Sequence, residues 1–289
     1  MIEVDGRSLH VERRGVGEPL LLIQGLSGHS GHWGEPFLEA LARDFDVIAY
    51  DHRGTGRSSR VEGPFTLAQL ADDAAGLVRA LGLEGVHVLG ISMGGMVAQE
   101  LALGHPEVVL TLSLGCTMFG GPRSIFTAPA VQQEITEAVM SGDRERALRN
   151  GFEVNLSETF RAGEGRWEEW QASAAQRPVA LAVILLQLQA IGDFDAADRL
   201  ASLRVPTLVL HGTEDRMLDV RNGKMIAEAV PGARLEIFQG AGHLFFWEEP
   251  ERAAALVREH ALGDRAPEEL GRGQRAAGGG PPGRDGDAQ

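Results

Sequence analysis

The sequence predicts an α/β protein whose mostly parallel sheet is covered by helices on both faces. Short runs typical of β-strands alternate with longer segments of helical periodicity, which is the pattern of parallel strands joined by helices. Several runs are apolar throughout, as expected for strands that are buried on both faces. In addition, Gly90-Ile91-Ser92-Met93-Gly94 joins an apolar run to a helical pattern. This strand–turn–helix context is the one in which a Gly-x-Ser-x-Gly sequence forms a nucleophile elbow.

The individual elements follow from the same periodicities. The candidate strands are Leu9 to Arg13, Leu20 to Gln24, Val47 to Tyr50, Val86 to Ile91, Leu110 to Leu114, Thr207 to His211 and Arg234 to Phe238. The candidate helices are Phe37 to Arg43, Thr66 to Leu81, Met93 to Gly104, Asp219 to Ala229 and Pro250 to His260. In the second of these helices, apolar residues at 67, 70, 74, 77, 78 and 81 form a stripe that should face the sheet.

The alternation of strands and helices breaks between residues 120 and 195, where helical periodicity continues without strand-like runs. An insertion of this size with enough apolar residues to pack is predicted to form a helical cap and not a linker. The α/β core would then comprise residues 1–119 and 196–263, on either side of a cap at 120–195. The last segment, 264–289, is rich in Gly, Pro, Arg and Asp. We expect it to be disordered because it has almost no large apolar residues.

Composition excludes several classes of protein. The 289-residue chain carries 27 Lys and Arg against 41 Asp and Glu, so its formal net charge is −14. This balance argues against nucleic acid or an anionic membrane as a partner. The single cysteine, Cys116, excludes an intrachain disulfide and a multi-cysteine metal cluster. The N-terminus does not have the pattern of a secretory signal, and the longest apolar window, 178–190, is too short to span a bilayer. We therefore expect a soluble cytoplasmic protein.

Ser92 is the candidate nucleophile. The turn around it is too tight for side chains at Gly90 and Gly94, and it exposes the hydroxyl at a helix N-terminus, where developing negative charge is favoured. The alternative interpretation, an ordinary turn serine, is disfavoured by the flanking strand and helix. A serine hydroxyl is a poor nucleophile at neutral pH, so it needs a base and a group that orients this base.

Two later loops supply these groups. Asp215 follows the strand that ends at His211, and His243 lies in a Gly-rich loop after the strand that ends at Phe238. The order Ser, Asp, His is the one found in hydrolases of this strand–turn–helix type. Glu214 and Asp219 are alternatives for the acid. The loop after the preceding strand, Gly115-Cys116-Thr117-Met118, offers no carboxylate.

The chain has eight other histidines that compete with His243 for the role of the base. We expect His211 to be a buried histidine at a strand end. We expect His52 to belong to a loop motif whose charged residues fix a turn.

Five stretches together resemble the α/β-hydrolase superfamily, over about residues 1 to 262. They are Gln24-Gly25-Leu26, Asp51-His52-Arg53-Gly54-Thr55-Gly56-Arg57-Ser58, the elbow around Ser92, His211-Gly212-Thr213-Glu214-Asp215 and Gly242-His243. Within the superfamily, residues 90–98 and 50–58 are similar to 3-oxoadipate enol-lactonases and aclacinomycin-type methylesterases. The resemblance implies an α/β-hydrolase fold with an inserted cap and no cofactor or metal. It also implies an oxyanion hole formed by the backbone N–H groups of Leu26 and Met93, with Gln24 where relatives often have histidine.

The substrate pocket is less constrained by the sequence. His29, His32, Trp33, Met118 and Phe119 are candidate pocket walls, although packing in the core is an alternative for Trp33, Met118 and Phe119. A metal site at His29 and His32 is disfavoured because no carboxylate or cysteine stands at ligand spacing. The acidic balance of the chain disfavours highly anionic substrates unless an arginine such as Arg123 or Arg177 enters the pocket.

The expected function is a serine hydrolase that cleaves an ester or lactone of a small organic molecule through an acyl-enzyme on Ser92. Carbon–carbon bond hydrolysis and a cofactor-free perhydrolase or haloperoxidase activity are alternatives on the same triad. Haloalkane dehalogenase and epoxide hydrolase relatives use Asp where this chain has Ser92. A ligand receptor on a hydrolase fold is a further alternative from another class, since fold alone does not determine function.

Overall fold

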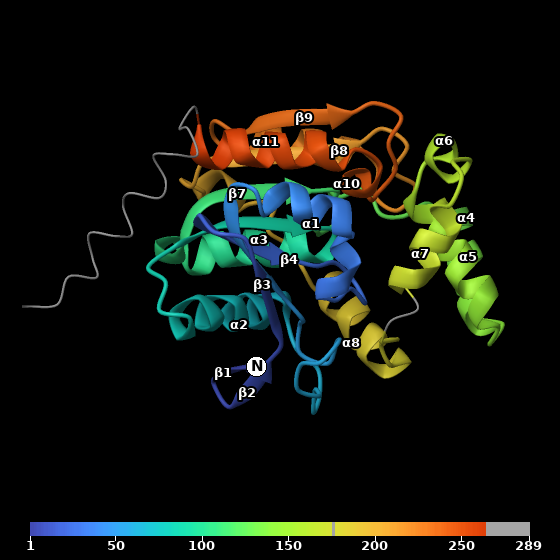
Figure 1. The fold of residues 1–289 in the computed structure, drawn as a ribbon, viewed down its shortest axis with the longest axis horizontal. Coiled ribbons are helices and arrows are strands. Elements are labelled where there is room, and N and C mark those ends of the chain that lie inside the picture. The colour runs from blue at the N-terminus through green and yellow to red at the C-terminus, as the bar shows by residue number, and fades with distance from the viewer. Residues whose placement is uncertain (175–176, 264–289) are drawn as a thin grey trace, which may run out of the picture.

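The computed structural model describes residues 1–174 and 177–263, and its centre is a seven-stranded sheet in the order β3-β5-β4-β6-β7-β8-β9 (Figure 1). β3 pairs antiparallel with β5, and all other neighbouring strands are parallel. β1 and β2 form a separate antiparallel pair at the N-terminus. The predicted fold class is therefore confirmed.

The strands lie close to the predicted positions. Their bounds are β1 Ile2–Val4, β2 Arg7–Leu9, β3 Val11–Arg14, β4 Glu18–Ile23, β5 Phe45–Tyr50, β6 Val86–Ile91, β7 Val109–Gly115, β8 Thr207–Gly212 and β9 Arg234–Phe238. The α-helices are α1 Glu35–Leu41, α2 Leu67–Ala80, α3 Met93–Gly104, α4 Pro129–Met140, α5 Arg144–Asn155, α6 Glu158–Arg161, α7 Arg166–Ala174, α8 Leu181–Gly192, α9 Arg221–Ala229, α10 Phe245–Glu248 and α11 Pro250–Leu262. Short 3₁₀ helices span Ser30–Trp33, Pro106–Val108 and Leu200–Ser202.

The predicted strand from Leu9 to Arg13 is divided between two sheets. β2 ends at Leu9, which pairs with Ile2 of β1, and β3 begins at Val11 in the central sheet. The turn between β1 and β2 consists of Asp5 and Gly6, whose φ angles are 46° and 76°. Positive φ at both positions defines a hairpin turn for which Asp-Gly is a strong sequence signal. The hairpin was therefore readable from the sequence, and the prediction missed it.

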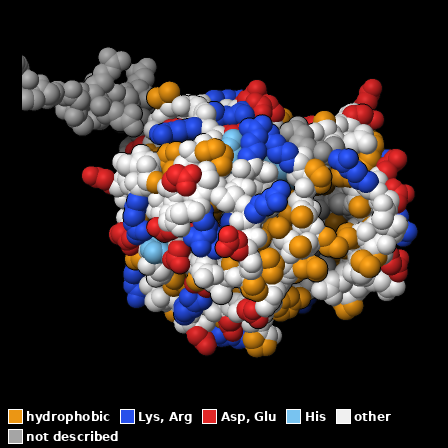
Figure 2. Space-filling view, turned by 90° about the horizontal axis from the view of Figure 1, so that it is seen from below, with side chains coloured by type: hydrophobic (Ala, Val, Ile, Leu, Met, Phe, Trp, Pro, Cys, Tyr) orange, Lys and Arg blue, Asp and Glu red, His pale blue; other side chains and the backbone are white. Residues whose placement is uncertain are grey.

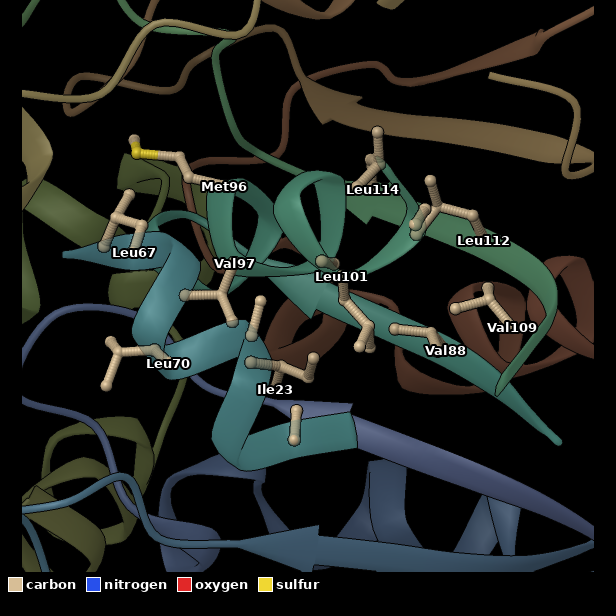
Figure 3. Packing of buried hydrophobic residues seen from close by; sticks show 14 of the residues in the cluster. Ile23, Leu67, Leu70, Val88, Met96, Val97, Leu101, Val109, Leu112 and Leu114 are labelled. Atoms are coloured by element: carbon tan, nitrogen blue, oxygen red, sulfur yellow. The ribbon is translucent and has the colours of Figure 1, made fainter. Parts of the chain in front are cut away.

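Helices cover both faces of the central sheet, and alternate strand residues face opposite sides. Along β4, Leu21 and Ile23 belong to the buried cluster that includes α2 and α3, whereas Leu20 and Leu22 belong to the cluster that includes α1 and α11. Figure 3 shows the first of these clusters, in which side chains of α2 and α3 pack against those of β4, β6 and β7. Burial on both faces explains why these strands are apolar without alternation.

The inserted segment forms helices beside the sheet. α4 to α8 lie between β7 and β8 in the chain, and Figure 1 shows α4 to α7 to one side of the layered core. An antiparallel bridge joins Gly120 to Asp195, and Ala196 N donates to Phe119 O at 2.8 Å. The chain thus leaves and re-enters the core at adjacent points, where we placed the ends of the cap. We keep the name cap for residues 120–195.

Two expectations from the sequence concern other parts of the chain. The predicted disorder of residues 264–289 lies outside the described residues. None of the helices in the described ranges is both long and apolar enough to cross a membrane.

Replacing Gly94 with Ala should destabilise the fold, because a Cβ there would lie 2.1 Å from the backbone oxygen of Ile23 in β4. We expect the free energy of unfolding to fall by about 2 kcal/mol or more, as for other overpacked sites. Gly104→Ala is the matched control in the same helix, because a Cβ at Gly104 meets no atom within 4 Å. It should change the free energy by less than about 1 kcal/mol. Urea unfolding measures both, and equal effects would contradict the packing of α3 on β4.

Candidate active site

Ser92 sits in the sharp turn between β6, which ends at Ile91, and α3, which begins at Met93. Its backbone has φ 53° and ψ −123°, a conformation that non-glycine residues rarely adopt. Such strain costs about 1–3 kcal/mol and persists only where the surroundings enforce it. Here Ser92 N donates to Gly115 O at 2.9 Å, and Thr117 Oγ1 donates to Ser92 O at 2.7 Å. The neighbouring strand β7 and its loop therefore hold the turn in place.

The backbone segments of the turn approach each other so closely that both predicted elbow positions, Gly90 and Gly94, require glycine. A Cβ on Gly90 would lie 2.3 Å from Gly94 O. The backbone at these two positions is in contact, so the turn has no room for side chains there.

Asp215 and His243 come together from the loops after β8 and β9. His243 Nδ1 donates to Asp215 Oδ2 at 2.7 Å, and both side chains are buried. Because Nδ1 donates its proton to the carboxylate, the Nε2 atom of the neutral ring is left as the basic nitrogen. The structure places Ser92 and His243 on the same cavity, without a direct hydrogen bond between these two described side chains.

Asp215 receives hydrogen bonds on both of its oxygens. Oδ1 accepts from the backbone N–H groups of Met217 and Leu218, each at 2.8 Å. Oδ2 accepts from His211 Nε2 at 3.0 Å in addition to His243. Burial alone would raise the pKa of Asp215, but the charge on His243 and the hydrogen bonds from both histidines outweigh it and hold this pKa well below its usual value. Asp215 is therefore ionised throughout the neutral range.

His211 is buried at the strand end, as predicted, but its contact with Asp215 was missed. Its Nε2 lies 2.9 Å from Leu218 O as well as 3.0 Å from the carboxylate. Both neighbours are acceptors, so Nε2 carries the proton. α9 packs against the other side of the ring, since a Cβ on Gly223 would lie 2.8 Å from His211 Nδ1. The sequence feature that could have indicated this contact is the position of His211, four residues before Asp215.

The loop motif that begins at Asp51 fixes the loop after β4. His52 Nε2 donates to Gln24 O at 2.9 Å, and burial lowers the pKa of His52. Asp51 accepts from Ser30 N at 2.7 Å and from Arg57 N at 2.8 Å. These residues hold turns, as expected, and the loop that they hold carries Leu26.

The two amides implied as oxyanion donors flank Ser92. Met93 is the first residue of α3, so its N–H precedes the intrahelical hydrogen bonds. Leu26 lines the same cavity as Ser92 and His243. Gly25 brings this loop against Ser92, because a Cβ on Gly25 would lie only 3.1 Å from Ser92 Cβ. Backbone donors fixed in this way are suited to stabilise an oxyanion.

The cavity over Ser92 has a volume of about 420 Å³ and is lined by both core and cap. Its wall is mostly apolar, and Leu148, Trp170 and Ile184 of the cap contribute to it. Figure 2 shows a hollow on the side of the molecule that carries the cap, edged largely by hydrophobic side chains. A second hollow of about 530 Å³ on the cap surface adjoins it, sharing Arg144 and Leu148, and is not lined by Ser92, Asp215 or His243.

The prediction that His29, Trp33, Met118 and Phe119 form pocket walls is wrong, because none of the four lines this cavity. His29, Trp33, Met118 and Phe119 are all buried elsewhere. Trp33 packs against Phe246, with ring centroids 5.2 Å apart, in the cluster on the α1 side of the sheet. Met118 and Phe119 belong to the cluster on the opposite side. Trp33, Met118 and Phe119 therefore pack in the core, which was the alternative raised for them from the sequence. His29 lies against His32, with ring centroids 3.8 Å apart.

Of the predicted wall residues, His32 lines the cavity, and other aromatic and basic residues line it too. His32, Trp170 and Trp247 line the cavity, and Trp247 Nε1 donates to His32 O at 3.0 Å. Burial lowers the pKa of His32 to about 3, with the neighbouring His29 adding to the effect, so the ring is neutral. Of the two arginines considered, Arg177 lines the cavity, whereas Arg123 pairs with Asp198 on the surface.

Comparisons with known proteins agree with this fold. A family model described as alpha/beta hydrolase fold matches residues 18–250. "Putative carbamate hydrolase RutD" of Azorhizobium caulinodans is 31% identical over 243 residues, covering 84% of this chain and 91% of the relative. "Putative non-heme bromoperoxidase BpoC" of Mycobacterium tuberculosis is 27% identical over 251 residues, covering 84% and 94%. The crystal structure of the esterase RhEst1 from Rhodococcus sp. ECU1013 has a TM-score of 0.76 and 27% identity, covering 90% and 96%.

The chain therefore belongs to the α/β-hydrolase fold family, as the resemblance implied. Its family and its relatives support a hydrolase activity.

Replacing His211 with Leu should raise the pKa of Asp215 by removing one hydrogen bond to its carboxylate. Because the pKa of Asp215 is lower in the folded state than in the unfolded state, its charge stabilises the fold at pH values above the unfolded-state pKa of about 3.9. This stabilisation is lost as the pH falls toward the folded-state pKa. We therefore expect H211L to lose about 1.5–3 kcal/mol of unfolding free energy at pH 7. Part of this loss should disappear as the pH falls below about 4.

Chemical denaturation across this pH range measures the effect. His105→Leu is the matched control, because His105 also bonds a carboxylate, that of Asp72 at 2.8 Å, but at the surface. A difference between H211L and wild type that does not change with pH would contradict a role of His211 in stabilising the charged form of Asp215.

Proposed function

We propose that this protein is a serine hydrolase that cleaves esters or lactones of small organic acids through an acyl-enzyme on Ser92. The observation that carries the proposal is the buried hydrogen bond between Asp215 and His243 beside the cavity that also exposes Ser92. A positioned base and an orienting carboxylate are what a serine needs to act as a nucleophile at neutral pH.

The reaction follows from these positions. Ser92 Oγ attacks the substrate carbonyl while His243 Nε2 takes its proton, and Asp215 stabilises the resulting imidazolium. The amides of Leu26 and Met93 donate to the oxyanion, where one such donor is worth about 2.7–4 kcal/mol. His243 then gives its proton to the leaving alcohol. A water molecule activated by the same ring releases the acid and restores Ser92.

The test of this function is covalent labelling. A fluorophosphonate probe should modify Ser92 in the native protein, and Ser92→Ala should abolish both labelling and ester turnover. Turnover should fall by several orders of magnitude, about 10⁴-fold or more by comparison with other triads. Ser202→Ala removes an exposed serine outside the cavity and serves as the control. Mass spectrometry of the digested protein locates the adduct; modification at another residue, or none, would rule out the proposal.

A cofactor-free perhydrolase activity is the second candidate, supported by the similarity to a protein named as a non-heme bromoperoxidase. Carbamate hydrolysis is a further candidate activity, because one relative is named as a carbamate hydrolase. Parallel assays of p-nitrophenyl esters, lactones, carbamates, a vinylogous diketone and peroxide-dependent bromination separate these chemistries. Among these substrates, we expect the highest kcat/KM for an ester or a lactone.

The charge of the cavity wall adds a prediction on substrate preference. Among the described lining residues there are two arginines, Arg144 and Arg177, and no acidic side chain, although the chain as a whole has a net charge of −14. Arg177→Met should therefore lower kcat/KM about fivefold for the anionic 4-nitrophenyl hydrogen glutarate, an effect of about 1 kcal/mol. It should leave the neutral 4-nitrophenyl valerate nearly unchanged.

Arg123→Met is the control for this comparison, because Arg123 pairs with Asp198 away from the cavity. The ratio of the two kcat/KM values should also fall with added salt in the wild type, since exposed charges are screened. A ratio that Arg177→Met does not alter would show that this arginine does not contact the substrate.

A further inference from the structure

The loop that carries the Leu26 amide is held by side chains from three different parts of the chain. His52 donates to Gln24 O at 2.9 Å, and the Gln24 side chain accepts from Gly25 N at 2.9 Å. On the other side of Leu26, the N–H of Ser27 donates to Oε1 of Gln187 at 2.9 Å. Within the described part of the chain, the Leu26 amide itself has no protein acceptor. The neighbouring amides are thus occupied, and that of Leu26 is left for the cavity that this residue lines.

Gln187 belongs to helix α8 of the cap, 160 residues along the chain from Ser27. Its side chain is fully buried, and it does not line the cavity. Its Nε2 atom has no hydrogen-bond partner among the described residues. Leaving the NH₂ group of a buried amide without a partner costs stability, because this group has lost its hydrogen bonds to water. Leu or Met at this position would fill the same space without that cost, so packing alone does not account for a glutamine here.

The hydrogen bond from Ser27 holds a strained piece of backbone. Ser27 has φ 56°, in the left-handed region that residues other than glycine rarely adopt. Such a conformation is unfavourable and persists only where neighbouring groups enforce it. The peptide on the carboxyl side of Leu26 is the one that Gln187 fixes. Without this acceptor, the loop could relax and turn the Leu26 amide away from Ser92.

We propose that Gln187 is a positioning residue through which the cap sets the oxyanion hole. Its Oε1 fixes the orientation of Ser27 N and thereby that of the Leu26 amide, so that the donor is in place before charge develops on the substrate. Gln187 does not touch the substrate and acts through the loop. The inference rests on the proposed function, because it assigns a role to a residue in an acyl-transfer reaction at Ser92.

The experiment compares three variants with the wild type on one p-nitrophenyl ester. Gln187→Met removes the acceptor and keeps the length of the side chain. Gln187→Glu keeps an oxygen at the same position, since burial favours the neutral acid. Gln189→Met is the matched control, because Gln189 lies two residues away on α8 and is exposed. Q187M should lower kcat about 10- to 100-fold, below the 10²–10³-fold typical of losing an oxyanion donor outright.

The KM of Q187M should stay within about threefold of the wild-type value, since the interaction is made in the transition state. Q187E should recover most of the kcat, and Q189M should match the wild type. The affinity for 2-phenylethylboronic acid, which forms a tetrahedral adduct at serine, should fall with kcat. The affinity for the planar product analogue 3-phenylpropanoate should not.

Three results would overturn the inference: Q187M with wild-type kcat, equal losses in Q187M and Q187E, or equal losses of affinity for the boronic acid and the carboxylate. The last two would assign Gln187 to packing. If Q187M fails to fold in a thermal melt, Gln187→Asn replaces it, because its amide is too short to reach Ser27 N. A wild type that neither cleaves esters nor reacts with a fluorophosphonate would instead reject the proposed function, so the two failures are distinguishable.

Discussion

The buried charge of Asp215 is the constraint around which the site is arranged. A carboxylate removed from water is costly unless it is hydrogen-bonded and paired. Asp215 meets this requirement through two backbone amides and two histidines. One of the histidines, His243, reaches the cavity, and the other, His211, is enclosed between the carboxylate and helix α9. The same set of contacts therefore stabilises the charge of Asp215 and orients the His243 ring.

The sheet brings the remaining parts of the site to this carboxylate. β4, β6, β8 and β9 are parallel members of the central sheet, so the loops after their carboxyl ends meet at one edge. These loops carry Leu26, Ser92, Asp215 and His243. The cap covers this edge, lines part of the cavity and contacts the Leu26 loop through Gln187. The strained backbone at Ser92 and Ser27 is held by hydrogen bonds from other elements, in keeping with strain that surroundings must enforce.

Most of the core and the turn around Ser92 could be predicted from the sequence, because they depend on local patterns. Continuous apolar runs located the strands buried on both faces, and the glycines at 90 and 94 marked the elbow. The pocket walls could not be predicted in this way. Trp33 and Trp247 are both large aromatic residues near the site, and only tertiary packing places Trp247 on the cavity and Trp33 in the core. Likewise, no local signal pairs Gln187 with Ser27.

The most direct test of the account is a crystal structure of the fluorophosphonate adduct. We expect phosphorus bonded to Ser92 Oγ and a phosphoryl oxygen about 2.7–3.1 Å from the amide nitrogens of both Leu26 and Met93. We also expect His243 within hydrogen-bond reach of Ser92 Oγ, with its Nδ1 still hydrogen-bonded to Asp215. An adduct whose phosphoryl oxygen points away from both amides, or a His243 ring separated from Asp215, would contradict it.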